Sequence, residues 1–267
     1  MWLRCESCWA PAPMLETALR TRRAEGCKLL IPYLMGGMTD DWSQSLAAVV
    51  VAGADAVEVG IPFSDPMMDG PVIQEAALQA LQRGTVPGRV LDDIARADVR
   101  VPVAVMTYYN IVFRAGHRRM ARSLAESGVS GAIIPDLSLE EVGPWADEAD
   151  QAGVDTVLLV APSSPEDRVE RICGRAKGFV YAVARMGVTG EQADVGADAR
   201  AVVERVRRYT DVPVCVGVGV STPEQAAQVC EVADGVVVGS ALVRRLLTGG
   251  GPEAAAEFVG SLRAALD

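Results

Sequence analysis

The chain has 267 residues, of which half are hydrophobic and 5% aromatic, and its formal net charge is −10 at pH 7. An acidic surface repels nucleic acid and anionic lipid, so any phosphate group must be held by local donors rather than by a basic field. No apolar run is long enough to span a bilayer, and residues 1–14 lack the order of a signal peptide. We therefore expect a cytoplasmic protein that binds neither nucleic acid nor membrane.

The predicted elements begin with an N-terminal extension, residues 1–13, expected to be poorly ordered, and an extra amphipathic helix over residues 14–25. From residue 29 onward, short segments rich in Val and Ile alternate with longer segments of helical periodicity, the pattern of repeated βα units. The expected strands are 29–35, 56–62, 101–108, 131–135, 156–161, 179–184, 214–218 and 236–239.

Local signals predict where the helices between these strands begin and end. Ser138, Ser164 and Ser221 each precede acidic or proline residues suited to a first turn, so we expect them to be N-caps. Gly128 and Gly153 each stand just before a predicted strand and are expected to end the preceding helices.

Strict alternation of strands and helices predicts a parallel sheet, either closed or doubly wound. Eight units favour closure, and the GxGxxG fingerprint of dinucleotide-binding sheets is missing. The predicted fold class is α/β, a (β/α)₈ TIM barrel with an extra N-terminal helix, in a single domain over residues 1–267.

The six cysteines do not form a metal-site pattern. Cys5 and Cys8 make a CxxC, but no second pair stands at zinc-site spacing and His117 is the only histidine in the chain. We therefore predict no metal site. Three further cysteines fall in predicted helices and strands, where reduced, buried thiols are expected: Cys173, Cys215 and Cys230.

Glu58 lies in the apolar segment AVEVGI, which reads as a strand buried on both faces. An unpaired carboxylate is costly there, so its presence needs a reason. Near the carboxyl end of its strand it would face the barrel mouth, where burial raises a carboxyl pKa toward the range useful for proton transfer. The alternative is a structural ion pair with a neighbouring Arg or Lys.

The following segment, PFSDPMMDGP over residues 62–71, holds two acids and three prolines. Proline restricts the backbone, so Asp65 and Asp69 are expected in defined positions, as a preorganised site requires. The alternative is that either Asp merely caps the helix that begins near Val72.

Glycines follow the sixth, seventh and eighth predicted strands, at the corner where such barrels bind phosphate through backbone N–H groups. Each glycine alone is compatible with an ordinary turn, and Arg185 would add charge if it faces the site. Five apolar and aromatic residues at strand ends are expected to line the remaining mouth and suit a planar substrate: Tyr33, Met106, Tyr108, Ile133 and Tyr181. For Met106 and Ile133, core packing is the alternative.

Several motifs in this order closely resemble the tryptophan synthase α subunit family from about residue 29 to residue 242: VEVGIPFSDP, DGPVIQ, VMTYYN, IIPDL, MGVTG and VGVGVSTPEQA. The resemblance implies a (β/α)₈ barrel that cleaves indole-3-glycerol phosphate to indole and glyceraldehyde 3-phosphate by a retro-aldol reaction, without a cofactor. It also implies a β subunit partner in an α₂β₂ complex, with pyridoxal phosphate bound only by that partner.

Matched by motif, Glu58 is expected to shuttle protons at indole C3 and the glycerol hydroxyl, and Asp69 to hydrogen-bond the indole N–H. The phosphate contacts fall on Gly190, Gly219, Gly239 and Ser240. The positions around indole and the closing loop are Tyr33, Tyr108, Tyr181 and Thr189. Pro62 and Asp65 fall on the face toward the partner.

The sequence departs from the family pattern at residues 35–39 (MGGMT for TAGDP), at Val218, where many members have Phe, and at Met67 and Met68, which replace Leu-Ala. These changes touch the first loop, the indole pocket and the partner-facing loop. Three alternatives therefore stay open: a duplicated stand-alone indole-releasing lyase, a catalytically weak allosteric activator of a β subunit, and a phosphate-binding barrel isomerase.

Overall fold

The computed structural model describes residues 14–97, 99–184, 195–217 and 219–267. The predicted extension 1–13, with Cys5 and Cys8, lies outside these residues. So do Arg185, Thr189, Gly190 and Val218.

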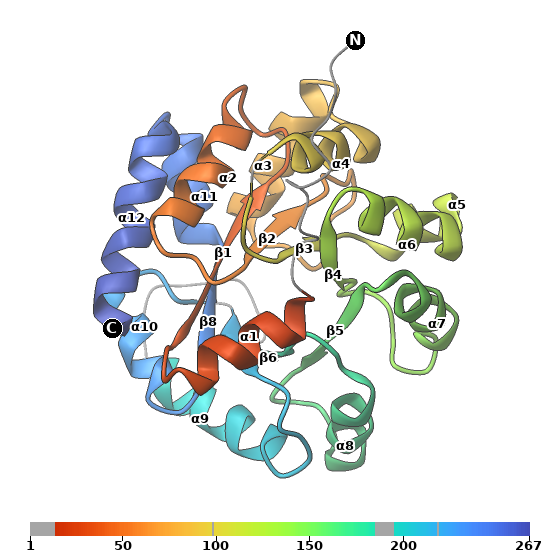
Figure 1. Ribbon diagram of the computed structural model, residues 1–267, viewed down its shortest axis with the longest axis vertical. Helices are drawn as coiled ribbons and strands as arrows, with labels where there is room; N and C mark the ends of the chain where they lie inside the picture. The colour runs from red at the N-terminus through yellow and green to blue at the C-terminus, as the bar shows by residue number, and fades with distance from the viewer. Residues whose placement is uncertain (1–13, 98, 185–194, 218) are drawn as a thin grey trace, which may run out of the picture.

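Eight parallel strands close into a barrel in the order of the chain (Figure 1). β1 pairs with β8 as well as with β2, which removes both sheet edges. The predicted barrel and its eight strands are confirmed, each within a few residues. The strands are β1 Leu29–Met35, β2 Val57–Gly60, β3 Val103–Met106, β4 Val129–Ile133, β5 Asp155–Val160, β6 Val180–Val183, β7 Val214–Gly217 and β8 Gly235–Val238.

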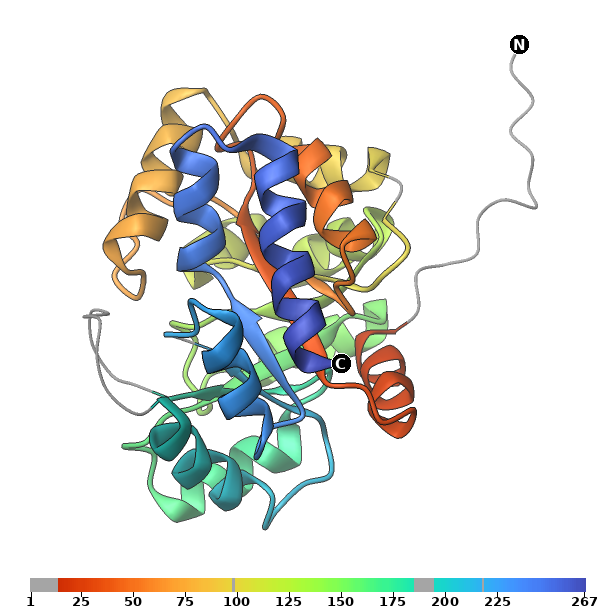
Figure 2. The same ribbon diagram turned by 90° about the vertical axis from the view of Figure 1, so that its left-hand side faces the viewer.

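Helices surround the strands (Figures 1 and 2). They are α1 Leu15–Ala24, α2 Trp42–Val51, α3 Pro71–Gln82, α4 Pro87–Arg96, α5 Tyr109–Ala115, α6 His117–Glu126, α7 Gly143–Ala152, α8 Glu166–Arg175, α9 Val195–Val206, α10 Pro223–Cys230, α11 Ser240–Leu247 and α12 Gly251–Leu266. In the part of the chain that the structure describes, no helix is both long and apolar enough to cross a membrane. The cytoplasmic location stays a prediction.

The three serine N-caps were predicted wrongly. Ser138 lies five residues before α7 and its hydroxyl donates to Glu141, while the Ser164 hydroxyl accepts the Ala161 N–H in a turn before α8. At α10 the cap is Thr222, whose hydroxyl accepts the Gln225 N–H. Serine also binds local backbone in turns, so its position alone did not identify the caps.

The predicted glycine stops are confirmed. Gly153 is the C-cap of α7 with φ +75°, and Gly128 follows the C-cap of α6 with φ +80°. Both adopt the left-handed conformation that reverses a helix into the next strand at little cost for glycine.

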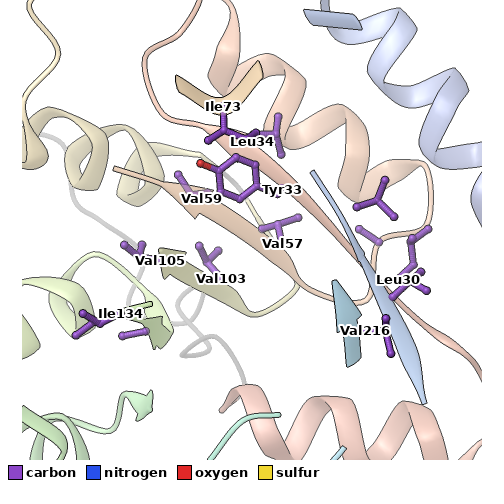
Figure 3. Close-up of a cluster of buried hydrophobic side chains, with 14 of the residues drawn as sticks. Leu30, Tyr33, Leu34, Val57, Val59, Ile73, Val103, Val105, Ile134 and Val216 are labelled. Atoms are coloured by element: carbon purple, nitrogen blue, oxygen red, sulfur yellow. The ribbon is translucent and has the colours of Figure 1, made fainter. Parts of the chain in front are cut away.

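Two hydrophobic layers build the interior. The larger lies between the strands and the surrounding helices, and Figure 3 shows part of it around β1, β2 and β3. The smaller fills the lumen, where Leu15 and Leu19 of α1 belong to the same buried cluster as Leu29 of β1 and Phe179, which directly precedes β6. The predicted extra helix therefore closes the amino-terminal end of the barrel.

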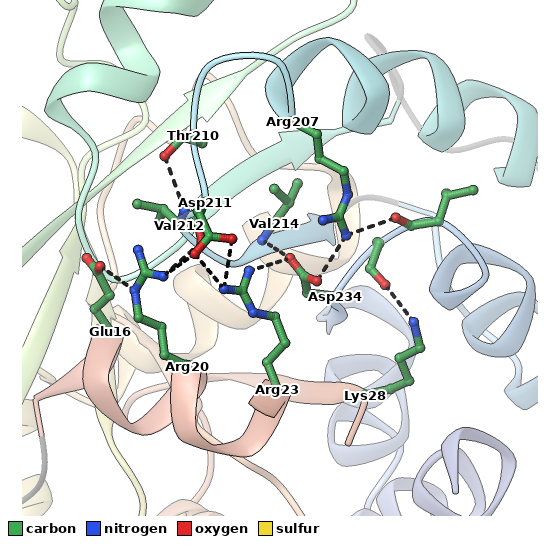
Figure 4. Close-up of polar contacts among 12 residues, drawn as sticks. Glu16, Arg20, Arg23, Lys28, Arg207, Thr210, Asp211, Val212, Val214 and Asp234 are labelled. Atoms are coloured by element: carbon green, nitrogen blue, oxygen red, sulfur yellow. Dashed lines mark hydrogen bonds and ion pairs between the residues drawn. The ribbon is translucent and has the colours of Figure 1, made fainter. Parts of the chain in front are cut away.

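Buried aspartates hold that closed end together. Asp55 accepts the Leu30 N–H at 2.8 Å, Asp155 the Glu16 N–H at 2.9 Å and Asp234 the Val214 N–H at 2.8 Å. Arginines complete two of these three sites, as Figure 4 shows for Asp234, which also binds Arg23 and Arg207. Asp55 similarly binds Arg22 and Arg263.

Candidate active site at the barrel mouth

Glu58 is the last side chain that β2 directs into the lumen. Val57 and Val59 belong to the outer layer and Ala56 to the lumen, so Glu58 faces inward, and the next inward position is Gly60. Its carboxyl group is fully buried, and among the described residues neither oxygen has a hydrogen-bond partner. The ion pair considered as an alternative is absent from those residues.

Burial is the main reason why the Glu58 pKa rises to about 8, and the negative charge of Asp69 adds to the rise. A carboxyl group with this pKa is protonated at neutral pH and can act as an acid.

Asp69 lies in the loop between β2 and α3, and its side chain is partly buried. Burial raises its pKa to about 6, while a hydrogen bond from the Tyr108 hydroxyl acts in the opposite direction. Asp69 does not cap α3, because the N-cap is Gly70 and no side chain completes it. Asp65 does not cap α3 either, and its carboxylate accepts the Ser64 hydroxyl at 2.6 Å.

Tyr108 ties the Asp69 loop to the end of β3. Its buried hydroxyl accepts the Met68 N–H at 3.0 Å and donates to Asp69, and its ring stacks on Phe63 with centroids 5.0 Å apart. Phe63 was not among the predicted site residues. An aromatic residue in a proline-rich loop was the available signal, but its partner lies 45 positions away (108 − 63).

Tyr33 and Tyr181 come to the same mouth as the two acids. The pKa of Tyr33 is raised by burial and by the charges of Asp69 and Glu58, and the pKa of Tyr181 by burial and by Glu58. Glycines make room for both rings, since a Cβ at Gly60 would overlap Tyr33 and a Cβ at Gly217 would overlap Tyr181. These close contacts, more than turn formation, explain the two glycines.

Met106 is partly buried at the edge of the lumen layer, whereas Ile133 is fully buried within it. For Ile133, the core-packing alternative therefore describes its environment.

The glycine corner is formed in part by described residues. Gly239 is the N-cap of α11. A Cβ atom placed on Gly239 would lie 3.5 Å from the Cβ atom of Tyr33, so the two residues are neighbours. The N–H groups of Leu242 and Val243 donate to the Gly239 carbonyl, so in the first turn of α11 the N–H groups of Ser240 and Ala241 are the ones with no acceptor among the described residues. Such N–H groups at a helix start suit an anion. Gly219 is exposed with φ +103°, and a Cβ there would meet nothing within 4 Å. Thr189 and Gly190 lie outside the described residues.

The loop at residues 62–69 has an exposed outer side. Pro62 is buried and Asp65 is exposed, while Met67 is 84% exposed. On the adjoining α5, Phe113 is 67% exposed. Phe113 was not among the predicted interface residues, because an apolar residue in a helical segment is usually part of the core.

The divergent first loop is well packed in this chain. Met35 and Met38 are buried, and Gly36 and Gly37 lie so close to Val90 and Thr85 that a Cβ would clash with them. The departure from the family pattern at residues 35–39 is thus accommodated by local packing.

Over the ranges that the structure describes, no group of three or more His, Cys, Asp or Glu residues is arranged to hold a metal ion. Cys173, Cys215 and Cys230 are buried and free, as predicted.

Comparisons with known proteins agree with this geometry. A family model described as "Tryptophan synthase alpha chain" matches residues 19–259. Curated relatives with that name include one from Halorhodospira halophila, 47% identical over 93% of this chain and 94% of its own length. Another, from Thermobifida fusca, is 45% identical over 88% and 89%.

Solved structures give the same result. A chain of Mycobacterium tuberculosis tryptophan synthase superposes with a TM-score of 0.88 at 38% identity, covering 96% of this chain and 98% of that one. The α subunit from Legionella pneumophila gives 0.84 at 30% identity, covering 95% and 98%. The family inferred from the motifs is confirmed: the chain belongs to the tryptophan synthase alpha chain family.

Proposed function

We propose that Glu58 and Asp69 carry out the reaction of this family, the retro-aldol cleavage of indole-3-glycerol phosphate to indole and glyceraldehyde 3-phosphate. The observation that carries the proposal is the buried Glu58 carboxyl group, which has no partner among the described residues and shares the mouth with Asp69. A group held in this way is available to substrate.

The pKa values support different roles for the two acids. At neutral pH, Glu58 with a pKa of about 8 holds its proton, whereas Asp69 with a pKa of about 6 is ionised. Two acids with pKa values on either side of neutrality provide an acid and a base in one site.

In the first step Glu58 donates its proton to indole C3 while Asp69 accepts the N–H proton, which gives the indolenine tautomer. Glu58, now a carboxylate, then removes the proton from the hydroxyl on the carbon attached to C3. As that carbon becomes the aldehyde, the C–C bond breaks and its electrons move through the ring to nitrogen. The nitrogen recovers its proton from Asp69, so both acids return to their starting states.

The rest of the mouth positions the substrate. Tyr33, Tyr108 and Tyr181 would contact the indole ring. The phosphate would bind the N–H groups at Ser240 and the backbone at Gly219 and Gly239.

From the family resemblance, we assign Thr189 to the loop that closes over the substrate and Gly190 to the phosphate site. The proposed steps move only protons and use no cofactor of this chain. Pyridoxal phosphate would be held by the β subunit.

We assign the partner-facing role to a docking face made of loop 62–69 and α5. Asp65, Met67 and Phe113 are its exposed members. Pro62 is buried and would act by shaping the loop. Exposed apolar side chains beside a charged one are typical of a surface that another protein covers.

The test is indole release from indole-3-glycerol phosphate by the wild type and by Glu58→Gln, each alone and with a β subunit. We expect the wild type to release indole and the variant to lose activity in both conditions. Retained activity in Glu58→Gln, combined with loss of β-subunit stimulation in Asp65→Ala, would instead make this chain an allosteric activator. Absence of indole release by the wild type in both conditions would refute the proposed function.

A further inference from the structure

Most arginines in the part of the chain that the structure describes have a carboxylate partner, such as Arg168 with Glu140 at 2.8 Å. Arg114, Arg119 and Arg122 differ. All three are exposed, and no described residue forms a hydrogen bond or ion pair with them. They stand close together in the sequence, on α5 and α6, in a chain whose net charge is −10.

Arg118 lies among these residues but is paired with Glu148 of α7 at 3.1 Å. Its charge is therefore already neutralised by Glu148, and we do not count it with the unpaired arginines. Arg119 and Arg122 line a surface hollow of about 590 Å³ formed by residues 116–126. Among the described residues that line the hollow, Glu126 is the one carboxylate, so the surface there has an excess of positive charge.

One unpaired arginine lies on the docking face, and the other two lie on the helix that follows it. Arg114 directly follows the exposed Phe113 on α5, and Gly116 alone separates α5 from α6. Arg119 and Arg122 are three positions apart on α6, and residues at this spacing share one side of a helix. The positive charge of Arg114 thus borders the apolar surface already assigned to the partner, and Arg119 and Arg122 lie on α6, which packs against α5.

The chemistry of these residues indicates the kind of partner. Arginine pairs with carboxylates through two parallel hydrogen bonds and is enriched at protein interfaces. A long polyanion would also meet the acidic remainder of the chain, which repels it. A short acidic surface on a protein would contact only the local positive charge and would avoid that repulsion. These arginines therefore suit an acidic protein surface better than a polyanion.

We propose that Arg114, Arg119 and Arg122 form a basic face that binds an acidic surface of the β subunit next to the docking face. This inference rests on the proposed function, since it takes the β subunit as the partner. Complementary charge at the rim of an interface mainly raises the association rate and makes binding depend on salt.

The experiment compares β-subunit binding by the wild type and by the triple variant Arg114→Glu, Arg119→Glu, Arg122→Glu, at low and high salt. The matched control is Arg89→Glu on α4, an exposed arginine that likewise has no partner among the described residues. Thermal unfolding of each variant verifies that it is folded.

At low salt we expect the triple variant to bind the β subunit at least about tenfold more weakly, with a shallower salt dependence, and Arg89→Glu to bind like the wild type. A dissociation constant and salt dependence equal to those of Arg89→Glu would overturn the proposal. Loss of binding to a nucleic-acid probe, with β-subunit binding unchanged, would overturn it in favour of a polyanion.

Indole release by the wild type without the β subunit separates this result from the proposed function. If the wild type releases indole and the triple variant binds the β subunit as tightly as the wild type does, the basic-face proposal fails. The catalytic proposal is unaffected by that result. A wild type that binds the β subunit but releases no indole refutes the catalytic proposal. The basic face then stands if the triple variant binds the β subunit more weakly than the wild type.

Discussion

The two ends of the barrel treat buried carboxylates in opposite ways. At the amino-terminal end, Asp55 and Asp234 each accept a backbone N–H and bind two arginines. At the mouth, Glu58 is just as deeply buried, and no described residue bonds either oxygen. Burial alone therefore does not mark function. A buried acid whose hydrogen bonds are satisfied supports the fold, whereas one left unsatisfied is available for chemistry.

The same contrast appears in the aspartate that binds α1. Burial raises the pKa of Asp155, and its hydrogen bond from the Glu16 N–H opposes the rise. Glu58 has no such bond, and the charge of Asp69 increases its pKa further. The difference lies in the partners that each strand end provides.

The largest expected effect is on catalysis. Glu58→Gln keeps the shape of the side chain but removes the transferable proton, so kcat/KM for indole release should fall by roughly 10²- to 10⁴-fold. Steady-state kinetics measures this. If the variant keeps more than about a third of wild-type activity, Glu58 does not transfer the proton and the contrast between the two ends fails.

Asp55→Asn should cost about 3–5 kcal/mol of unfolding free energy, because it leaves Arg263, whose side chain is 12% exposed, without its buried counter-charge. Denaturant unfolding measures the loss. Indole release per folded molecule should stay near the wild-type value, since Asp55 lies at the closed end. If Asp55→Asn is as stable as the wild type but releases indole more slowly, then Asp55 serves catalysis rather than the fold, and the contrast between the two ends is wrong.

Glu58→Gln should also change how stability depends on pH. The folded pKa of about 8 exceeds the unfolded value of 4.5, so the folded state binds more protons and wild-type stability falls as pH rises from 4.5 to 8. The upper limit of this loss is about 5 kcal/mol, from about 1.4 kcal/mol per pH unit. Unfolding of both proteins across this range should show a steeper loss of stability in the wild type than in the variant, which keeps the smaller contribution of Asp69. Parallel curves would contradict the prediction.

The pH profile of kcat/KM should be bell-shaped. Activity should rise as Asp69 ionises near pH 6 and fall as Glu58 loses its proton near pH 8, by about tenfold per pH unit beyond each limit. Because the two acids interact, these limits belong to the pair. Asp69→Asn should remove its acid limb from whatever activity remains, and an unchanged acid limb would exclude Asp69 as the base.

The smallest effect is expected from Tyr108→Phe, with a fall in kcat/KM of several-fold. Loss of the hydroxyl removes the hydrogen bond that lowers the Asp69 pKa, so the acid limb should move to higher pH. The bond to the Met68 N–H is lost as well. A reduced rate with an unshifted acid limb would mean that Tyr108 only contacts substrate and does not position Asp69.

Predictions that rest on short stretches of sequence agree best with the structure. Alternating apolar segments gave eight strands, and the glycines before β4 and β5 end helices as expected, because both signals depend on residues that are near neighbours. The serine caps failed although they are local, since a serine hydroxyl also binds turn backbone. The roles of Glu58 and Asp69 stay predictions, because the geometry shows their placement and not the reaction.

By itself, the sequence determined the repeated strand and helix pattern, the family and the presence of an acid in an apolar strand. Each of these depends on residue order over a few positions or on motifs read in series. The packing of distant segments was needed to show that Leu15 and Leu19 close the lumen and that Tyr108 holds the Asp69 loop. It also showed that Asp55 is paired, whereas Glu58 has no partner among the described residues. Those features depend on groups far apart in the chain, which strand pairing and helix packing bring into contact.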